Sequence, residues 1–348
     1  MEFKIKNRLI KPGNATYIIA ELSANHDQDF NRAVKLIKVA KEIGADAVKL
    51  QTYSADTITI NCDNEYFRIN QGTLWGGRTL YDLYSEAHTP WDWQPKLNAV
   101  AEQVGIDLFS SPFDETAVDF LEKMHVPAYK IASFEIVDLP LIQRIAQTGK
   151  PIIMSTGMAT LAEIEEAIAV IRKTGNNQIA LLKCTSAYPA SPEEMNLNTI
   201  SHLSKAFTVP VGISDHTLGI EVPLAAVALG ACIVEKHFTL SRSHPGPDSR
   251  FSLEPHEFKK LIEGIRIVEQ ALGGISYGIT EKQKASRLFR RSLFVVEDIK
   301  EGHMFTRKNI RSIRPGNGLH TRYLDVVLGK KARINIDRGT PLSWDLIA

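Results

Sequence analysis

Two histidines, His216 and His237, lie at matching points of two successive strand-like segments. Residues 209–216 are an apolar run that ends in polar residues, and residues 232–238 repeat this pattern after a helix-like stretch. A single histidine at a strand end is more often a hydrogen-bonded core residue than a ligand. Two at equivalent positions of neighbouring parallel strands can share a divalent cation. Without a third histidine or cysteine in the pattern, we favour octahedral Mn, Mg or Fe over structural zinc, acting as a Lewis acid on a carbonyl oxygen.

Lysines and carboxylates lie in or beside other strand-like runs. A barrel core requires branched apolar side chains, so Lys49 and Lys130 need a local reason, and two ammoniums are suited to binding phosphate or carboxylate. Glu21 and Glu135 could move protons beside them. Three further charged residues, Lys183, Glu235 and Lys236, are instead expected to point outward to the helices as satisfied polar groups.

Hydroxyl side chains accompany these lysines at the ends of the strand-like runs. They are Ser133, Ser155, Thr156, Ser186 and Ser214. Each could simply cap the helix that follows its strand. Together they are suitable donors to phosphate oxygens. The predicted site is a cationic phosphate and carboxylate pocket beside a Lewis-acidic metal, a combination suited to joining a phosphorylated enol to a carbonyl compound.

The elements that position these residues alternate between apolar β-branched runs and segments with helical periodicity. We predict strands at residues 17–22, 47–52, 107–111, 128–133, 151–156, 179–185, 211–214 and 232–238. We predict helices at residues 31–43, 95–104, 115–123, 139–148, 161–174, 197–207, 220–229 and 255–272. Eight of each match a (β/α)8 TIM barrel. The alternative is an open doubly wound sheet, but no Gly-x-Gly-x-x-Gly follows the first strand. The long, aromatic connection at residues 53–93 predicts a lid or binding loop.

The remaining composition limits the class of protein. Residues 1–275 are expected to form the barrel domain, residues 276–290 a linker, and residues 291–348 a small β-rich domain divided by turn signals. Basic residues outnumber acidic ones about two to one after residue 280, but they are interspersed, so we expect no nucleic-acid partner. The charged N-terminus and the lack of a long apolar run predict a cytoplasmic protein without a membrane partner. The three cysteines have no paired spacing, and the two in apolar runs are expected to be buried thiols.

Eight ordered motifs in the barrel region resemble the sialic acid synthase family. They lie at residues 18–26, 48–52, 110–113, 129–135, 150–158, 212–217, 235–239 and 245–248. Residues 314–318 resemble the C-terminal antifreeze-like, or SAF, domain of that family. Residues 75–81 and 88–91 are most similar to the pseudaminic acid synthase branch.

This resemblance implies that phosphoenolpyruvate condenses with an open-chain N-acetylated amino sugar and releases phosphate by C–O cleavage. It implies that Lys49, Lys130, Ser133, Ser155, Ser186 and Ser214 hold phosphoenolpyruvate, that His216 and His237 hold Mn, with Mg or Co as substitutes, and that Gln51, Tyr188, Asp248, Arg314 and Asn317 contact the sugar. Glu21 would activate the aldehyde or position water, and Glu135 would orient water and the enol. Family members form domain-swapped homodimers, in which Arg314 would reach the partner's site.

The resemblance also bears on the substrate. Neuraminate-type members have an asparagine where this chain has Ser186, which favours a diacetamido-trideoxy sugar over N-acetylmannosamine. The aromatic insertion at residues 74–93 agrees, because a sugar with a methyl in place of a hydroxymethyl offers more apolar surface. We therefore predict a pseudaminic acid synthase activity. The alternatives are an N-acetylneuraminate or legionaminate synthase and, in another class, a non-catalytic carbohydrate-binding protein on the same scaffold.

Overall fold

The computed structural model describes residues 2–70, 75–244 and 246–348, and the chain forms two compact units, Met1–Gly273 and Gly274–Ala348. Residue 74 of the aromatic insertion and Pro245 of the last barrel motif lie outside the described residues. None of the described helices is long and apolar enough to cross a membrane.

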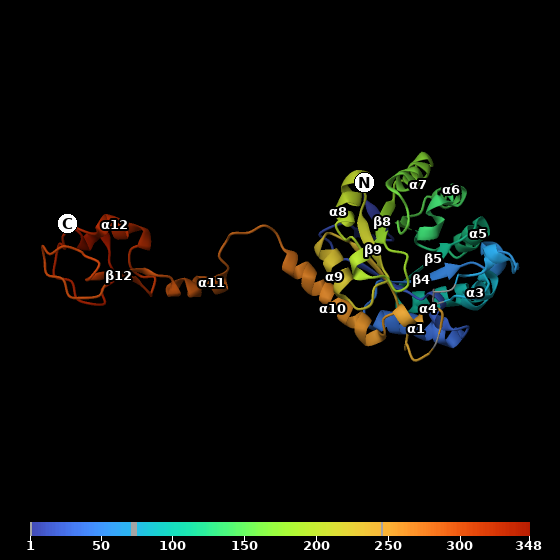
Figure 1. Cartoon of the computed structure of the whole chain (residues 1–348), viewed down its shortest axis with the longest axis horizontal. Helices are drawn as coiled ribbons and strands as arrows, with labels where there is room; N and C mark the ends of the chain where they lie inside the picture. The colour runs from blue at the N-terminus through green and yellow to red at the C-terminus, as the bar shows by residue number, and fades with distance from the viewer. Residues whose placement is uncertain (1, 71–74, 245) are drawn as a thin grey trace. The chain divides into compact units, whose positions relative to one another are not determined.

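Within the described part of the first unit, eight parallel strands close into a barrel (Figure 1). They are β3 (Tyr17–Glu21), β4 (Ala47–Thr52), β5 (Asp107–Pro112), β6 (Tyr129–Ile131), β7 (Ile152–Ser155), β8 (Ile179–Cys184), β9 (Val211–Asp215) and β10 (Ile233–His237). Almost every residue in them is buried, because helices cover the outer face and side chains fill the inner one. The predicted TIM barrel is confirmed, and all eight predicted strands exist.

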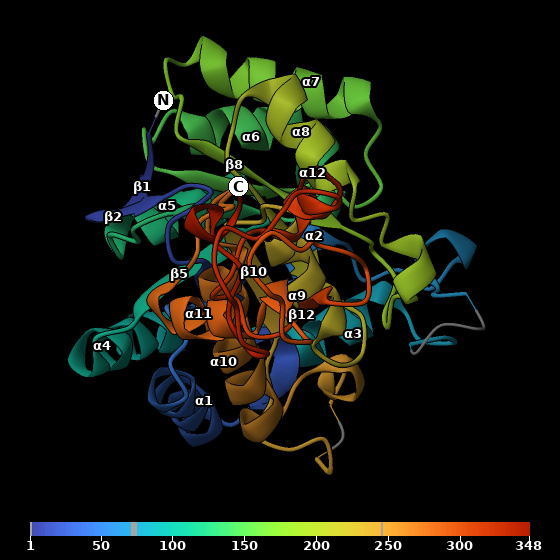
Figure 2. The same cartoon turned by 90° about the vertical axis from the view of Figure 1, so that its left-hand side faces the viewer.

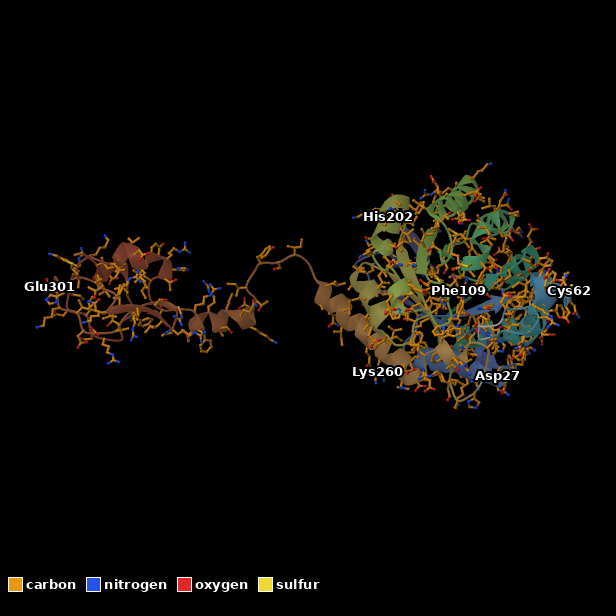
Figure 3. All side chains as sticks on the ribbon, in the orientation of Figure 1. Asp27, Cys62, Phe109, His202, Lys260 and Glu301 are labelled. Atoms are coloured by element: carbon orange, nitrogen blue, oxygen red, sulfur yellow. The ribbon has the colours of Figure 1, made fainter. Side chains whose placement is uncertain are left out.

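Helices lie outside the strands (Figure 1 and Figure 2). They are α1 (Phe30–Glu42), α2 (Ala55–Ile58), α3 (Leu80–Ala87), α4 (Gln94–Val104), α5 (Glu115–Lys123), α6 (Leu139–Ala146), α7 (Leu161–Lys173), α8 (Thr199–Phe207), α9 (Glu221–Ala228) and α10 (Pro255–Leu272). Local sequence sets where they begin: the Asp29 carboxylate accepts backbone N–H bonds at the start of α1, and Thr160 and Glu163 form a capping box at the start of α7. Phe109 is fully buried in the barrel, whereas His202 and Lys260 lie on exposed helix faces (Figure 3).

A hairpin that the sequence analysis did not predict covers the N-terminal end of the barrel. Its strands are β1 (Phe3–Ile5) and β2 (Arg8–Ile10), and their apolar side chains join the barrel core. Arg8 pairs with Asp46, which directly precedes β4, and Lys6 pairs with Asp107, the first residue of β5. Because the hairpin packs against this end, substrate access is expected at the C-terminal strand ends.

The second unit has its own apolar core. It contains α11 (Glu281–Ser286), β11 (Ser292–Val295), β12 (Ile310–Ile313) and α12 (Leu324–Val327). β11 and β12 pair antiparallel, and Leu293, Val295 and Ile310 are among the buried residues between them and the surrounding turns. The unit is therefore a separately packed β-containing domain, as the turn signals predict.

Candidate active site

Two lysines and two glutamates form a buried ionic cluster inside the barrel. The Lys49 ammonium contacts the Glu21 carboxylate and lies 3.8 Å from Glu235 Oε1, and Lys130 Nζ lies 3.9 Å from that same oxygen. The strand register brings them together, because Glu21 pairs with Lys49 across β3 and β4. The prediction that Glu235 points outward is wrong: side chains alternate along a strand, so Glu235 faces the same side as His237, two residues later.

The hydroxyls of two strands bond directly to this cluster. Lys130 Nζ donates to Ser155 Oγ over 2.7 Å, and Ser214 Oγ donates to Glu235 Oε1 over 3.3 Å. Ser155 ends β7 and Ser214 lies in β9, so hydroxyls from separate strands meet the two ammoniums. An anion beside the lysines would find hydroxyl donors already oriented by the cluster.

Ser133 and Ser186 meet at Gly157. The Gly157 N–H donates to Ser133 Oγ over 3.2 Å. A Cβ atom added at Gly157 would lie 2.5 Å from Ser133 Oγ and 2.2 Å from Ser186 Oγ, closer than atoms can approach. Glycine at this position therefore lets hydroxyls from two loops approach one backbone residue. These loops follow β6 and β8, at the end of the barrel where the lysines and histidines lie.

The two histidines are neighbours, with ring centroids 5.4 Å apart. His216 Nδ1 lies 3.0 Å from the Thr185 carbonyl, which can only accept, so Nδ1 carries the proton and Nε2 keeps a lone pair. His237 Nδ1 is buried and makes no hydrogen bond to the described residues. Burial, with His216 and Lys49 nearby, lowers the pKa of His237, so its imidazole is neutral, the form that binds metals. Against the opposing effect of burial, Cys184 and the Thr185 carbonyl raise the pKa of His216, so a cation would compete with a proton for Nε2 of this ring, whereas the His237 ring already offers its lone pair. The pair fits a shared cation on these terms.

No group of three or more His, Cys, Asp or Glu side chains suited to a metal occurs among the described residues. The histidine pair alone would supply two ligands.

Cys184, which the sequence analysis assigned only as a buried thiol, places Sγ 3.8 Å from His216 Nδ1. All three cysteines are free, and Cys184 and Cys232 are buried as predicted.

Glu21 and Glu135 are carboxyls with raised pKa values. Burial raises the pKa of Glu135 to about 7, with Lys130 acting in the opposite direction. Burial likewise raises the pKa of Glu21 despite the opposing effect of Lys49. Glu135 Oε2 has no hydrogen-bond partner in the described structure. Carboxyls that titrate near neutrality can both accept and return protons.

Polar and aromatic side chains flank the histidines and the ionic cluster. Gln51 Nε2 donates to Glu21 Oε1 at 3.2 Å and to Ser23 Oγ at 3.1 Å. Ser23, which the sequence analysis did not select, also donates to the Asp248 carboxylate. The Tyr188 ring lies 4.4 Å from the His216 ring. Three residues predicted from different motifs, Glu21, Gln51 and Asp248, are thus connected through one additional serine.

Arg314 and Asn317 lie in the second unit and are exposed there. Their contact with a sugar stays a prediction.

Lys183 and Lys236, expected to be satisfied polar groups, are both hydrogen-bonded. Lys236 bonds to Asp215 and to the Thr217 carbonyl, and Lys183 donates to the Cys184 carbonyl.

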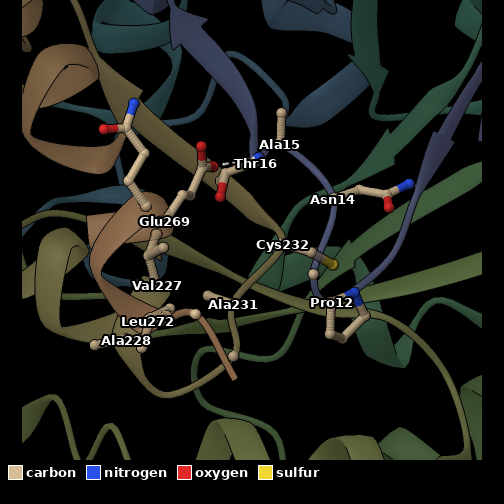
Figure 4. Close-up of a pocket in the computed structure, with 14 residues that line it drawn as sticks. Pro12, Asn14, Ala15, Thr16, Val227, Ala228, Ala231, Cys232, Glu269 and Leu272 are labelled. Carbon is tan, nitrogen blue, oxygen red and sulfur yellow. Dashed lines mark hydrogen bonds between the residues drawn. The ribbon is translucent and has the colours of Figure 1, made fainter. Parts of the chain in front are cut away.

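A cavity of about 460 Å³ lies at the other end of the barrel (Figure 4). It is lined by residues that precede β3 and β10 and by the C-terminal ends of α9 and α10. Its carboxylate, Glu269, accepts the Thr16 N–H at 2.6 Å and pairs with Arg266, so it is fully engaged. This cavity therefore offers no free carboxylate among its described lining residues, in contrast to the C-terminal strand ends.

A barrel with this site and a small C-terminal domain defines a class of enzyme. The family model described as "NeuB family" matches residues 36–277, and the model described as "SAF domain" matches residues 290–348. The chain therefore belongs to the NeuB family, which confirms the resemblance to the sialic acid synthases. It is a transferase that forms carbon–carbon bonds.

Known proteins resemble the chain along nearly its whole length. Pseudaminic acid synthase from Helicobacter pylori is 46% identical, covering 94% of this chain and 96% of that protein. N,N'-diacetyllegionaminic acid synthase from Legionella pneumophila is 37% identical, covering 97% of each. The crystal structure of N-acetylneuraminic acid synthetase from Leptospira borgpetersenii, in complex with citrate, has a TM-score of 0.72 at 32% identity and covers 82% of this chain and 95% of that one.

Proposed function

We propose that the protein is a pseudaminic acid synthase. It condenses phosphoenolpyruvate with 2,4-diacetamido-2,4,6-trideoxy-L-altrose and water to give pseudaminic acid and phosphate. The observation that carries this function is the convergence of Lys49 and Lys130 with hydroxyls from several strands, beside two neighbouring histidines. The identity to pseudaminic acid synthases, higher than to the legionaminate enzyme, supports the choice of sugar.

The reaction forms a bond between C3 of phosphoenolpyruvate and the aldehyde carbon of the sugar. Water adds at C2, and the C2–O bond to phosphate breaks. Lys49, Lys130 and the serines hold the phosphate and carboxylate, displacing contacts that Glu235 now makes to both ammoniums. Glu135 positions the water, and its pKa near 7 lets it accept the proton that water loses. Glu21 holds the aldehyde end together with Gln51.

His216 and His237 hold a divalent metal, for which we favour Mn over Mg or Co. When bound, the metal supplies Lewis-acid polarisation of the aldehyde oxygen. The unpartnered Nδ1 of His237 and the fixed tautomer of His216 support this assignment.

The test is phosphate release from phosphoenolpyruvate by the full-length protein with a panel of sugars, with Mn²⁺ or with EDTA. We expect release only when Mn²⁺ and the diacetamido-trideoxy-altrose are both present, with a product of the mass of pseudaminic acid. Equal release with N-acetylmannosamine or with the legionaminate precursor would refute the substrate choice. Sugar binding without phosphate release would indicate a carbohydrate-binding protein.

We also propose that the protein works as a domain-swapped homodimer. Three apolar side chains in the loops that follow β6, β7 and β9, at the end where the site lies, are more than half exposed: Phe134 (56%), Met158 (58%) and Leu218 (63%). Such exposure supports cover by another surface. The basic C-terminal domain of a second copy would fit this role and bring Arg314 to an anionic substrate. The three unpaired cysteines support a cytoplasmic location.

Complementation tests this assembly. Arg314→Ala and His237→Ala subunits, each expected to be inactive alone, are coexpressed. In a swapped dimer the mixed species has one intact site, built from the barrel of the first and the C-terminal domain of the second. We expect activity to return to about a quarter of wild type, because half of the dimers are mixed. No recovery in a verified mixed dimer, or an active monomer truncated after Gly274, would refute the swap.

A further inference from the structure

Trp75 joins three loops at the C-terminal end of the barrel. It lies half-buried in the long connection between β4 and α4. Its indole Nε1 donates a 3.1 Å hydrogen bond to the Pro247 carbonyl in the loop after β10. Its ring centroid lies 5.8 Å from that of Tyr188, in the loop after β8. The indole is therefore held from two sides.

The aromatic contacts continue from Trp75 to the histidine pair. The Tyr188 ring lies 4.4 Å from that of His216 and 5.3 Å from that of Phe251. The Phe251 ring in turn lies 4.8 Å from that of His237. We define the aromatic wall as Trp75, Tyr188 and Phe251. The wall starts beside the proposed aldehyde site and reaches outward to Trp75.

The residue that follows Pro247, the hydrogen-bond partner of Trp75, has a polar side chain. Asp248 is the neighbour of Pro247, and its carboxylate accepts from Ser23 Oγ and, at 3.4 Å, from the Ala24 N–H. Through Ser23 this carboxylate is linked to Gln51 and Glu21. Trp75, in contrast, is linked to His216 through the Tyr188 ring, so the site has a polar side and an aromatic side. Such an arrangement suits a sugar with polar atoms near its aldehyde and an apolar far end.

We propose that Trp75 is a specificity-determining residue that receives the methyl end of the sugar against its indole. This inference rests on the proposed function. The indole N–H is already used by Pro247, and the Trp75 and Tyr188 rings are apolar on their faces. A hydroxymethyl group there would lose hydrogen bonds to water without gaining a partner, so a 6-hydroxy sugar is disfavoured.

The test compares 2,4-diacetamido-2,4,6-trideoxy-L-altrose with its 6-hydroxy counterpart, which differs by one oxygen. Steady-state kinetics are measured for wild type, Trp75→Phe and Trp75→Ala at saturating phosphoenolpyruvate and Mn²⁺. We expect Trp75→Ala to lower kcat/KM for the 6-deoxy sugar by about 10–200-fold, the range for apolar contacts, and to affect the 6-hydroxy sugar much less. Trp75→Phe keeps a ring and loses the N–H, so an intermediate preference is expected. The KM for phosphoenolpyruvate should stay within about twofold.

Tyr66→Ala is the matched control, because Tyr66 is an aromatic residue of the same connection but is 80% exposed. It should leave the preference between the two sugars unchanged. Equal losses for both sugars in Trp75→Ala, or a loss confined to phosphoenolpyruvate, would overturn the inference. Failure of the proposed function is seen separately, because wild type would then turn over neither sugar.

Discussion

Two buried ionic groups meet on strand β10, one residue apart, and they differ in how completely they are satisfied. On the outer side, the Lys236 ammonium is bonded by the Asp215 carboxylate and by the Thr217 carbonyl at 2.7 Å. On the inner side, Glu235 faces Lys49 and Lys130 at longer range, and its Oε2 has no hydrogen-bond partner in the described structure. A closed pair has no atoms left for a ligand and is costly only to break in half, whereas an incomplete one leaves atoms for a ligand. Residue types alone do not separate these two groups, but hydrogen-bond satisfaction does.

The largest expected effect is at the inner side, on replacing a histidine. We expect His237→Ala to lower metal-dependent turnover by more than about 100-fold. Loss of a residue that only hydrogen-bonds to a metal ligand already lowers metal affinity or activity by about 10–100-fold, and loss of the ligand itself should cost more. Mn²⁺ binding by calorimetry should be lost in parallel, while near-ultraviolet circular dichroism stays native.

His26→Ala is the control for that experiment. His26 is equally buried, but Nε2 contacts Thr89 Oγ1 at 3.0 Å and Nδ1 accepts from the Gln28 N–H, so it is already satisfied. Its loss should cost stability and leave Mn²⁺ affinity unchanged. Near wild-type Mn²⁺ affinity in His237→Ala would show that the histidine pair is structural.

The outer pair should give the opposite pattern. We expect Lys236→Met to lower the free energy of unfolding by about 3–5 kcal/mol, because it leaves the Asp215 carboxylate buried and unpaired. Chemical denaturation measures this, and kcat of the folded protein should stay within tenfold. Adding Asp215→Leu should restore much of the lost stability, since replacement of a whole buried pair by apolar groups is often neutral.

Lys130→Met is the inner counterpart of that change. It should raise KM for phosphoenolpyruvate by roughly 10–150-fold, the equivalent of about 1.5–3 kcal/mol for a hydrogen bond to a charged group. If Lys236→Met weakened phosphoenolpyruvate binding as much as Lys130→Met does, the distinction between the two sides would be wrong.

The barrel could be predicted because its strands are short, apolar and regularly spaced. The prediction of Glu235 failed although the signal was present. If His216 and His237 face inward, the period of two along a strand places Ser214 and Glu235 inward and Asp215 and Lys236 outward. The observed register, Glu235 beside Ser214 and Lys236 beside Asp215, agrees with this alternation.

Other parts of the site had no readable signal. Ser23 connects Gln51 to Asp248 because its backbone has a positive φ of 42°, a conformation that the sequence around it does not predict. The hairpin β1–β2 has strands of three residues, too short for a periodic pattern. The sequence marks Trp75 only as one aromatic residue of a long connection. Its hydrogen bond to Pro247 joins positions 172 residues apart, and no local pattern predicts such a contact.

The last expected effect depends on pH and concerns Glu135, an inner carboxyl whose burial raises its pKa from 4.5 to about 7. Between these values the folded protein holds a proton that the unfolded chain releases, so the contribution of Glu135 to stability falls as the pH rises through this window. Glu135→Gln removes the ionisable group, so the variant should exceed wild type in unfolding free energy by up to about 3 kcal/mol at pH 8.5 and show a much smaller difference at pH 5. Glu165→Gln, at an exposed helix position, should show no such pH dependence. A Glu135→Gln difference that is equal at both pH values would mean that this carboxyl is as well satisfied as Asp215, and would place it with the structural side of the comparison.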